Sequence, residues 1–479
     1  MPLGKILLYN TLSRKKEEFK PLKKDSVGMY TCGPTVYWFQ HLGNLRAYIA
    51  ADLLRRVLEF NGFKVRQAMN LTDVGHLTSD MDYGEDKMQK QAEKEGKTIK
   101  DIADFYAEDF FGNCKKLNIQ KPQIVAKATE HVPEMIELIK KLEAKGFTYQ
   151  TKIGLIYDTS KFKKYAEFGR LNLEESKAGT RLEADPERKQ PSDFALWITN
   201  QPKHVMQWQS PWGQGFPGWH IECSAMSLKY LGEEFDIHTG GQDHIQIHHT
   251  NEIAQSDGAT GKKTVHYWFH VAWLLGMNAV KMSKSSGEVI RLQDLEAEGF
   301  NPLDFRFYCL QSHYKSQIVF SLNALKDSMR ARTYLQELVH RLLDYTEGKE
   351  NNEAEKLIEK NKNAFIESIN NDLDSPKALA GLFDFARQVN AWINEKNLSK
   401  KNAMQVLDFF KEINSVLVVL GFKQEKTKLS EELMALIDER EKLRTQKKWK
   451  EADLIRAKLL EKGIQLLDSA EGIKWKKTK

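Results

Sequence analysis

The chain has 479 residues, of which 41% are hydrophobic and 29% charged, the composition of an ordinary soluble protein. This length exceeds what one hydrophobic core supports and predicts about three domains. The net charge is +6, yet residues 440–479 alone hold thirteen Lys or Arg against six Asp or Glu. Positive charge gathered at one end suits a polyanionic partner, although a solvated lysine-rich tail would show the same composition.

Neither a membrane span nor a secretory signal is expected. The longest apolar runs, such as residues 415–420, are far shorter than the ~20 residues that cross a bilayer. The first residues also lack the long apolar stretch of a signal peptide. The four cysteines are scattered along a large chain, which argues against a disulfide framework and leaves metal or catalytic roles open. We therefore expect a cytoplasmic protein.

The first predicted elements form a βαβ unit. Residues 28–32 have the pattern of a strand, which leads into a helical pattern over residues 44–60. Gly62 ends that helix, and residues 64–70 are expected to form the next strand. Because strand, helix and strand follow within about forty residues, we expect a parallel sheet.

The rest of the chain is expected to contain an insertion, a helical region and a separate C-terminal segment. Residues 125–210 have the pattern of an insertion, after which sheet-type sequence returns at residues 234–238 and 267–272. The pattern from residue 320 to 420 is helical, and the charged residues 423–428 indicate a linker. Beyond it we expect two helices and a small hairpin, at residues 431–445, 450–462 and 464–475.

Residues 41–44 (HLGN) fall where the first strand gives way to the first helix. Backbone N–H groups and the positive end of the helix dipole gather there and can receive a phosphate. Gly43 allows a ligand to approach the backbone closely, and His41 can donate a hydrogen bond to a phosphate oxygen. By itself the pattern is weak evidence, because a capping Asn after Gly is common in helices that bind nothing.

Residues 281–285 (KMSKS) form a more specific pattern. The ammonium groups of Lys281 and Lys284 can neutralise charge that develops on a leaving pyrophosphate. A lysine-rich surface turn is the alternative, but these five residues would occur by chance with odds on the order of one in ten thousand.

Together the two motifs resemble those of the class I aminoacyl-tRNA synthetases. The resemblance implies a Rossmann-type catalytic domain, Mg²⁺-ATP as a substrate, and transfer of an activated amino acid to tRNA. It implies that the residues in contact with ATP are His41, Gly43, Asn44, Lys281, Ser283 and Lys284. The sequence departs from the family pattern at Asn44, where a second histidine is usual. Asn44 can still donate a hydrogen bond, and its share of catalysis is an open question.

Four side chains have the character of ligands for a borderline metal ion. Cys32 ends the first strand, Cys223 lies far along the chain, and His248 and Glu252 are four residues apart, on one face of a helix. Two thiolates, an imidazole and a carboxylate make a plausible zinc set. Each cysteine alone is more simply explained as a small buried hydrophobic residue.

The sequences around these residues closely resemble those of the cysteinyl-tRNA synthetases over nearly the whole chain. The matching motifs, in the expected order, are YTCGPTVY (30–37), PGWHIECSAMS (217–227), FDIHTGG (235–241), HHTNEIAQS (248–256) and KMSKS (281–285). The resemblance implies that Cys32, Cys223, His248 and Glu252 hold one Zn²⁺, which binds the thiol of L-cysteine. A thiol deprotonates readily on zinc, whereas the serine hydroxyl is a poorer ligand, so an editing domain becomes unnecessary.

The resemblance also implies further contacts. The amino-acid pocket is expected to include Gly33, Thr72, Trp219, His238 and Asp243, although Trp219 could be core packing and Thr72 a turn former. The anticodon of cysteine tRNA is expected to contact Arg444, Trp449, Asp453 and Asp468, by stacking and by hydrogen bonds to base edges. The alternative is a capped helical hairpin with Trp449 as its core.

The expected fold is therefore α/β. A Rossmann-type catalytic domain with a connective insertion precedes a helical bundle and a small C-terminal α+β domain. The expected segments are the first half of the catalytic domain (1–124), the insertion (125–210), the second half (211–275), the KMSKS and tRNA-stem region (276–320), the bundle (321–422) and the anticodon-binding domain (425–479). We expect a monomer.

Two other functions would account for part of this sequence. A cysteine ligase that uses an amino-sugar acceptor, as in the mycothiol pathway, would share the zinc site but generally lacks an anticodon domain. A non-catalytic RNA-binding paralogue would be expected to lose its lysines or metal ligands, and none is missing here.

Overall fold

The computed structural model describes residues 4–75, 87–171, 187–199, 201, 204–276, 279, 289–423, 431–469 and 472–477. The chain divides into two compact units, Met1–Leu420 and Gly421–Lys479. No helix within the described ranges is long and apolar enough to cross a membrane.

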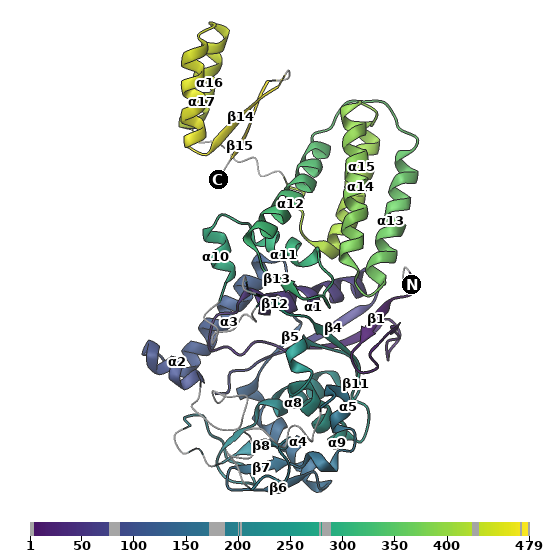
Figure 1. Ribbon diagram of the computed structural model, residues 1–479, viewed down its shortest axis with the longest axis vertical. Helices are drawn as coiled ribbons and strands as arrows, with labels where there is room; N and C mark the ends of the chain where they lie inside the picture. Colours follow the sequence, from purple (N-terminus) through teal and green to yellow (C-terminus); the bar gives the residue numbers. More distant parts are fainter. Residues whose placement is uncertain are drawn as a thin grey trace. The chain divides into compact units, whose positions relative to one another are not determined.

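The larger unit is built on a five-stranded parallel sheet (Figure 1). Its strands, in spatial order, are β11 (Val265–Val271), β10 (Phe235–Gly241), β3 (Ser26–Thr31), β4 (Lys64–Leu71) and β5 (Ile124–Lys127). The connections contain helices, chiefly α1 (Leu42–Phe60), α3 (Ile99–Lys116), α8 (Trp219–Leu231) and α9 (His248–Thr260). The predicted α/β fold with a parallel sheet is confirmed.

The strand order reverses at the centre of this sheet. From β3 the chain moves outward through β4 to β5, and β10 and β11 are later added on the other side of β3. Connections that diverge in this way leave a crevice at the carboxyl ends of the two central strands, where ligands bind in open α/β sheets. Cys32 directly follows β3, and Gly240 and Gly241 end β10, so these residues lie at that crevice.

Between β5 and α8 the chain forms a second, antiparallel sheet. Its strands are β6 (Thr148–Gln150), β7 (Gly154–Tyr157), β8 (Phe194–Ile198) and β9 (Phe216–Pro217). Two helices, α4 (Val132–Ala144) and α5 (Tyr165–Gly169), belong to the same segment. The stacked rings of Tyr157 and Phe194, 4.9 Å apart, join the hydrophobic core that also contains Cys32 and Cys223. The insertion thus shares one hydrophobic core with Cys32 and Cys223.

Several short elements complete the larger unit. They are the hairpin of β1 (Leu7–Asn10) and β2 (Lys15–Glu18), α2 (Lys87–Glu95), the parallel pair β12 (Leu274–Leu275) and β13 (Ile318–Val319), α10 (Leu292–Ala297) and α11 (Pro302–Leu310). On α11, the fully buried Arg306 forms an ion pair with Asp52 of α1 at 2.7 Å. The same guanidinium donates to the carbonyls of Leu117 and Leu417. One side chain therefore fixes α1 to segments far away in sequence.

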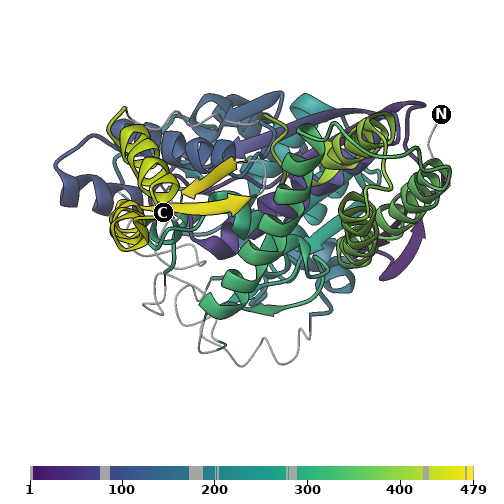
Figure 2. The same ribbon diagram turned by 90° about the horizontal axis from the view of Figure 1, so that it is seen from above.

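Four long helices follow, and α13, α14 and α15 lie side by side in both views (Figures 1 and 2). Their bounds, with α12 first, are Leu322–Leu343, Ala354–Asn370, Ser375–Asn394 and Lys400–Leu417. The smaller unit contains α16 (Glu431–Thr445), α17 (Trp449–Glu461) and an antiparallel hairpin of β14 (Ile464–Ser469) and β15 (Gly472–Lys477). The predicted pair of helices and hairpin in the C-terminal segment is confirmed.

Candidate functional site

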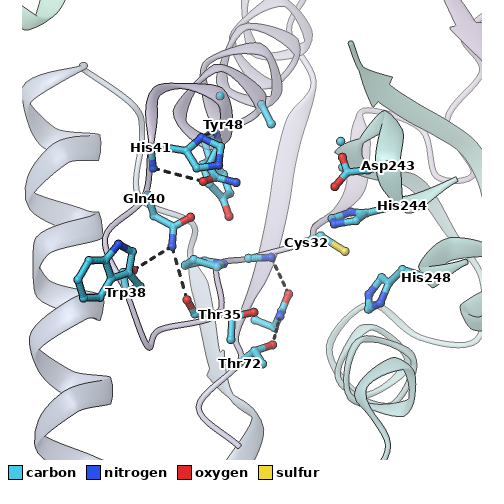
Figure 3. Close-up of a pocket in the computed structure, with 18 of the residues that line it drawn as sticks. Cys32, Thr35, Trp38, Gln40, His41, Tyr48, Thr72, Asp243, His244 and His248 are labelled. Atoms are coloured by element: carbon cyan, nitrogen blue, oxygen red, sulfur yellow. Dashed lines mark hydrogen bonds between the residues drawn. The ribbon is translucent and has the colours of Figure 1, made fainter. Parts of the chain in front are cut away.

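An open cavity of about 1060 Å³ lies at the carboxyl ends of β3 and β10. Its lining includes Cys32, Cys223 and His248, together with His41 and Asn44 at the start of α1. Figure 3 shows Cys32 and His248 on one side of the cavity and His41 on another. The fold thus brings the HLGN motif and three of the four predicted metal ligands to one space.

The start of α1 is closed by a reciprocal cap. The backbone N–H of Asn44 donates to His41 Nδ1, and the backbone N–H of His41 donates to Asn44 Oδ1, both at 3.3 Å. This capping box explains how an asparagine is accommodated at this position. A Cβ on Gly43 would lie 2.9 Å from the His41 ring, so a larger residue there would displace the ring that caps the helix.

The four predicted metal ligands converge. One donor atom from each of Cys32, Cys223, His248 and Glu252 lies within 4.8 Å of all the others, and all four residues are buried. The two Sγ atoms are 4.0 Å apart, and His248 Nε2 is 3.1 Å from a Glu252 carboxylate oxygen. In a tetrahedral zinc site with Zn–S bonds of about 2.3 Å, two thiolates lie about 3.8 Å apart. The donor types and their spacing therefore fit zinc.

Two buried histidines outside this set orient its members. His238 Nε2 donates to Glu252 Oε2 at 2.9 Å, and its ring stacks on Trp268 with centroids 4.6 Å apart. The Nδ1 atoms of His220 and His248 are joined by a hydrogen bond of 2.9 Å. Such partners fix the ring or carboxylate that faces a metal. His220 was missed in the sequence; its only signal was its place in the PGWHIECSAMS motif.

A second group of donors overlaps the first. Cys32, His238, His249 and Glu252 also converge within 4.8 Å, with His249 Nε2 at 3.3 Å from Cys32 Sγ. Neither His238 nor His249 lines the cavity, whereas Cys32, Cys223 and His248 do. The first set is therefore the one that a substrate entering the cavity can reach.

Burial and mutual contact shift the proton affinities of the cluster. Burial raises the pKa of the Cys32 thiol, and the neighbouring Cys223 raises it further. The hydrogen bond from Cys32 lowers the pKa of Cys223. Burial lowers the pKa of His248, but hydrogen bonds with Cys223 and Glu252 outweigh it and raise the pKa to about 10. Because metal binds the thiolate and the neutral imidazole, binding of a metal ion by these residues would release protons.

The predicted amino-acid pocket is only partly assembled around the cavity. Gly33, Thr72, Trp219 and Asp243 line it, but His238 does not, and its ring donates to the buried Glu252. A Cβ on Gly33 would lie 1.7 Å from the Asn70 carbonyl oxygen, so only glycine fits there.

Two of the lining residues already have polar partners. The Thr72 hydroxyl donates to Glu222 at 2.9 Å, and the Asp243 carboxylate accepts a longer hydrogen bond, 3.4 Å, from Trp273. His244 also lines the cavity, and burial lowers its pKa to about 4, so its ring is neutral near pH 7. The sequence prediction did not include His244.

The KMSKS motif, with Lys281, Ser283 and Lys284, lies outside the described residues. Its flanks are described: Leu274 and Val289 both line the cavity. Next to Val289, the carbonyl of Ile290 accepts a hydrogen bond of 2.9 Å from the N–H of Leu42, the first residue of α1.

In the smaller unit the predicted anticodon residues are spread over α16, α17 and β14. The Trp449 side chain is 56% exposed and takes no part in the core, which is formed by Ile437, Leu459, Ile464 and Leu466. The alternative in which Trp449 is the core of the hairpin is therefore wrong. Asp453 is exposed, and Arg444 lies 3.7 Å from Glu441. Asp468 lies in β14, and its side chain is outside the described part.

The fold and the cavity define a class of enzyme, and comparison with known proteins supports it. Residues 18–330 match the family of class I (C) tRNA synthetase catalytic domains, and residues 364–421 match the DALR domain. A solved methionyl-tRNA synthetase from Mycobacterium tuberculosis, bound to methionyl-adenylate, shares the fold with a TM-score of 0.58 and 15% identity. That match covers 82% of this chain and 90% of the other. The chain thus has the class I aminoacyl-tRNA synthetase fold.

Sequence relatives narrow the class to one family. A cysteine–tRNA ligase from Treponema denticola is 47% identical, over 98% of this chain and 99% of the relative. Another from Burkholderia lata is 42% identical, over 98% and 96%. The chain belongs to the cysteine–tRNA ligase family.

Proposed function

We propose that the protein joins L-cysteine to cysteine tRNA in two steps. The cysteine carboxylate attacks the α-phosphate of Mg²⁺-bound ATP, which forms cysteinyl-adenylate and releases pyrophosphate. A hydroxyl of the terminal tRNA ribose then attacks the carbonyl carbon of the adenylate, which forms the ester and releases AMP. Membership of the family supports the overall reaction. We propose that the protein acts as a monomer in the cytoplasm.

One observation carries the proposal: the thiol-rich donor cluster and the start of α1 line the same cavity. The donor cluster marks where a thiol side chain would bind, and the N-terminus of α1 marks where a phosphate would bind. An amino acid held at the first position presents its carboxylate toward the second. Figure 3 shows Cys32 and His248 on one side of this space and His41 on another.

The donor set is suited to holding zinc through Cys32, Cys223, His248 and Glu252. A zinc ion bound there would act as a Lewis acid that accepts a thiolate far better than a hydroxyl. His238 and His220 keep Glu252 and His248 oriented. Because the cluster is buried, water competes poorly for the position of the substrate side chain.

The nucleotide end of the cavity uses the start of α1. His41, Gly43 and Asn44 present the helix N-terminus, and Lys281 with Lys284 would neutralise the leaving pyrophosphate. The positions of Leu274 and Val289 in the cavity wall support this role, since the KMSKS segment connects them. Ser283 is proposed to contact the same phosphates.

We propose that the larger unit selects the amino acid and that the smaller unit selects the tRNA. We infer that Gly33, Thr72, Trp219 and Asp243 contact the amino acid, because each lines the cavity. His238 stays a predicted pocket residue, although its observed partner is Glu252. The exposure of Trp449 supports a stacking role with an anticodon base, alongside Arg444, Asp453 and Asp468.

The test separates the two steps. Pyrophosphate exchange, screened over the twenty amino acids, should respond to cysteine alone, and cysteine tRNA should then be charged. Lys284→Ala should slow exchange far more than it weakens cysteine binding, with Lys262→Ala on the surface as control. Exchange without charging of tRNA would contradict the proposal and favour another acceptor, such as an amino sugar.

A further inference from the structure

Four aromatic rings form a continuous group next to the cavity: Trp38, Phe39, Phe105 and Tyr106. The first two precede α1 and the other two are on α3. The ring centroids of Phe39 lie 5.6 Å from those of Trp38, 5.0 Å from Tyr106 and 6.1 Å from Phe105. We call this group the aromatic platform.

The platform runs from inside the cavity to the surface of the protein. Trp38 and Phe39 line the cavity, whereas Phe105 does not and is 44% exposed. In Figure 3, Trp38 lies across the cavity from Cys32 and His248. A ligand confined to the cavity would leave the outer part of the platform unused. The surface therefore suits an extended ligand that enters from outside.

Each of three platform rings has a cation above it. The pairs, with the distance from the cation to the ring centroid, are Trp38 and Lys94 (5.9 Å), Phe39 and Arg291 (4.9 Å), and Phe105 and Lys97 (4.8 Å). Lys97 also pairs with Glu95, and Arg291 with Asp294, so the net positive field is moderate. Proteins that bind single-stranded nucleic acid commonly do so through aromatic rings and nearby cations. The bases stack on the rings, and the phosphate backbone lies along the positive charge.

We propose that the aromatic platform binds the unpaired nucleotides at the 3′ end of the acceptor RNA. A base stacks on the exposed ring of Phe105 outside the cavity, while the terminal ribose passes Trp38 and Phe39 toward the activated amino acid. The inference rests on the proposed function, which requires an RNA end to enter this cavity. The adenine of ATP is the competing occupant, but it would reach only the inner part of the platform.

Phe105→Leu tests this inference, because it keeps the apolar volume and removes the stacking face. Phe105→Tyr keeps that face. Phe111→Leu is the matched control: Phe111 is also on α3 beneath a lysine, Lys121 at 5.1 Å, but it lines a different groove. Cysteine-dependent pyrophosphate exchange, measured without RNA, should be unchanged in all three.

The decisive measurement is tRNA affinity, with intact RNA and with RNA that lacks its unpaired 3′ nucleotides. Phe105→Leu should weaken binding of intact RNA on the order of 5- to 10-fold, leave binding of shortened RNA unchanged, and be rescued by Phe105→Tyr. Equal losses with both RNAs, or no loss with intact RNA, would overturn the inference. A raised KM for ATP in exchange would instead assign the platform to ATP. The binding assay needs no charging, so failure of the transfer reaction would appear separately.

Discussion

The Sγ atoms of Cys32 and Cys223 lie 4.0 Å apart although 191 residues separate them in the chain. Cys32 follows the central strand β3, and Cys223 lies on α8, whose N-terminal end faces the same crevice. This pairing depends on the doubly wound sheet rather than on any local motif. It places two soft ligands within reach of one ion and beside the phosphate-binding end of α1.

Replacing one thiol should therefore remove the metal. Cys223→Ser should reduce bound zinc well below one ion per chain and lower cysteine activation by about 100-fold or more, since a hydroxyl is a poor zinc ligand. Metal content and pyrophosphate exchange measure the two effects. Cys114→Ser is the control, because that thiol is equally buried but lies in a different cluster. Normal zinc content in Cys223→Ser would rule out Cys223 as a ligand.

His238 should act through Glu252. His238→Asn removes the hydrogen bond to Glu252 Oε2, so we expect zinc affinity to fall roughly 10- to 100-fold. Competition with a chelator measures that affinity. His266→Asn, at the more exposed end of β11, should leave it unchanged. If His238→Asn instead raises KM for cysteine with full zinc affinity, His238 contacts the substrate, as the sequence resemblance implies.

Asn44 combines a cap with a predicted phosphate contact, and two substitutions separate these roles. Asn44→Ala removes the acceptor for the His41 N–H and should cost about 1 kcal/mol of stability. Asn44→Asp keeps that acceptor, so the free energy of unfolding should be nearly unchanged. The aspartate, however, loses the donor and repels phosphate, so exchange should slow at least 10-fold, in line with a lost charge-assisted contact. Wild-type exchange in Asn44→Asp would show that Asn44 is only a cap.

Trp449 should contribute to RNA affinity without contributing to folding. Trp449→Ala should raise KM for tRNA on the order of 10-fold, as loss of one stacked base predicts, with exchange and thermal stability unchanged. Leu454→Ala on the same helix, at 71% exposure, is the control. A matching loss in Leu454→Ala would show that the effect is not specific to the ring.

The sequence predicted the parallel sheet and the convergence of Cys32, Cys223, His248 and Glu252, because strand and helix periodicity and specific motifs carry that information. It did not predict that His238 stays out of the cavity lining and donates to Glu252 instead. Residues alternate between the two faces of β10, and only the packing of α9 and Trp268 decides which face meets the cavity.

The sequence also did not predict the contacts made by the buried histidines around the donor cluster. His220 and His249 acquire their roles from helix-to-helix and helix-to-sheet contacts, such as the 2.7 Å hydrogen bond between His249 and His270. Likewise, the aromatic platform joins residues from two separate segments. Nothing in the spacing of either segment indicates that its rings meet those of the other.

The claim that zinc selects the substrate is tested most directly by pyrophosphate exchange with cysteine and with serine, in zinc-loaded protein and after rigorous zinc removal. We expect the loaded protein to activate cysteine in strong preference to serine, and the zinc-free protein to lose cysteine activation and regain it when zinc is restored. Full cysteine activation in the zinc-free protein would contradict the account.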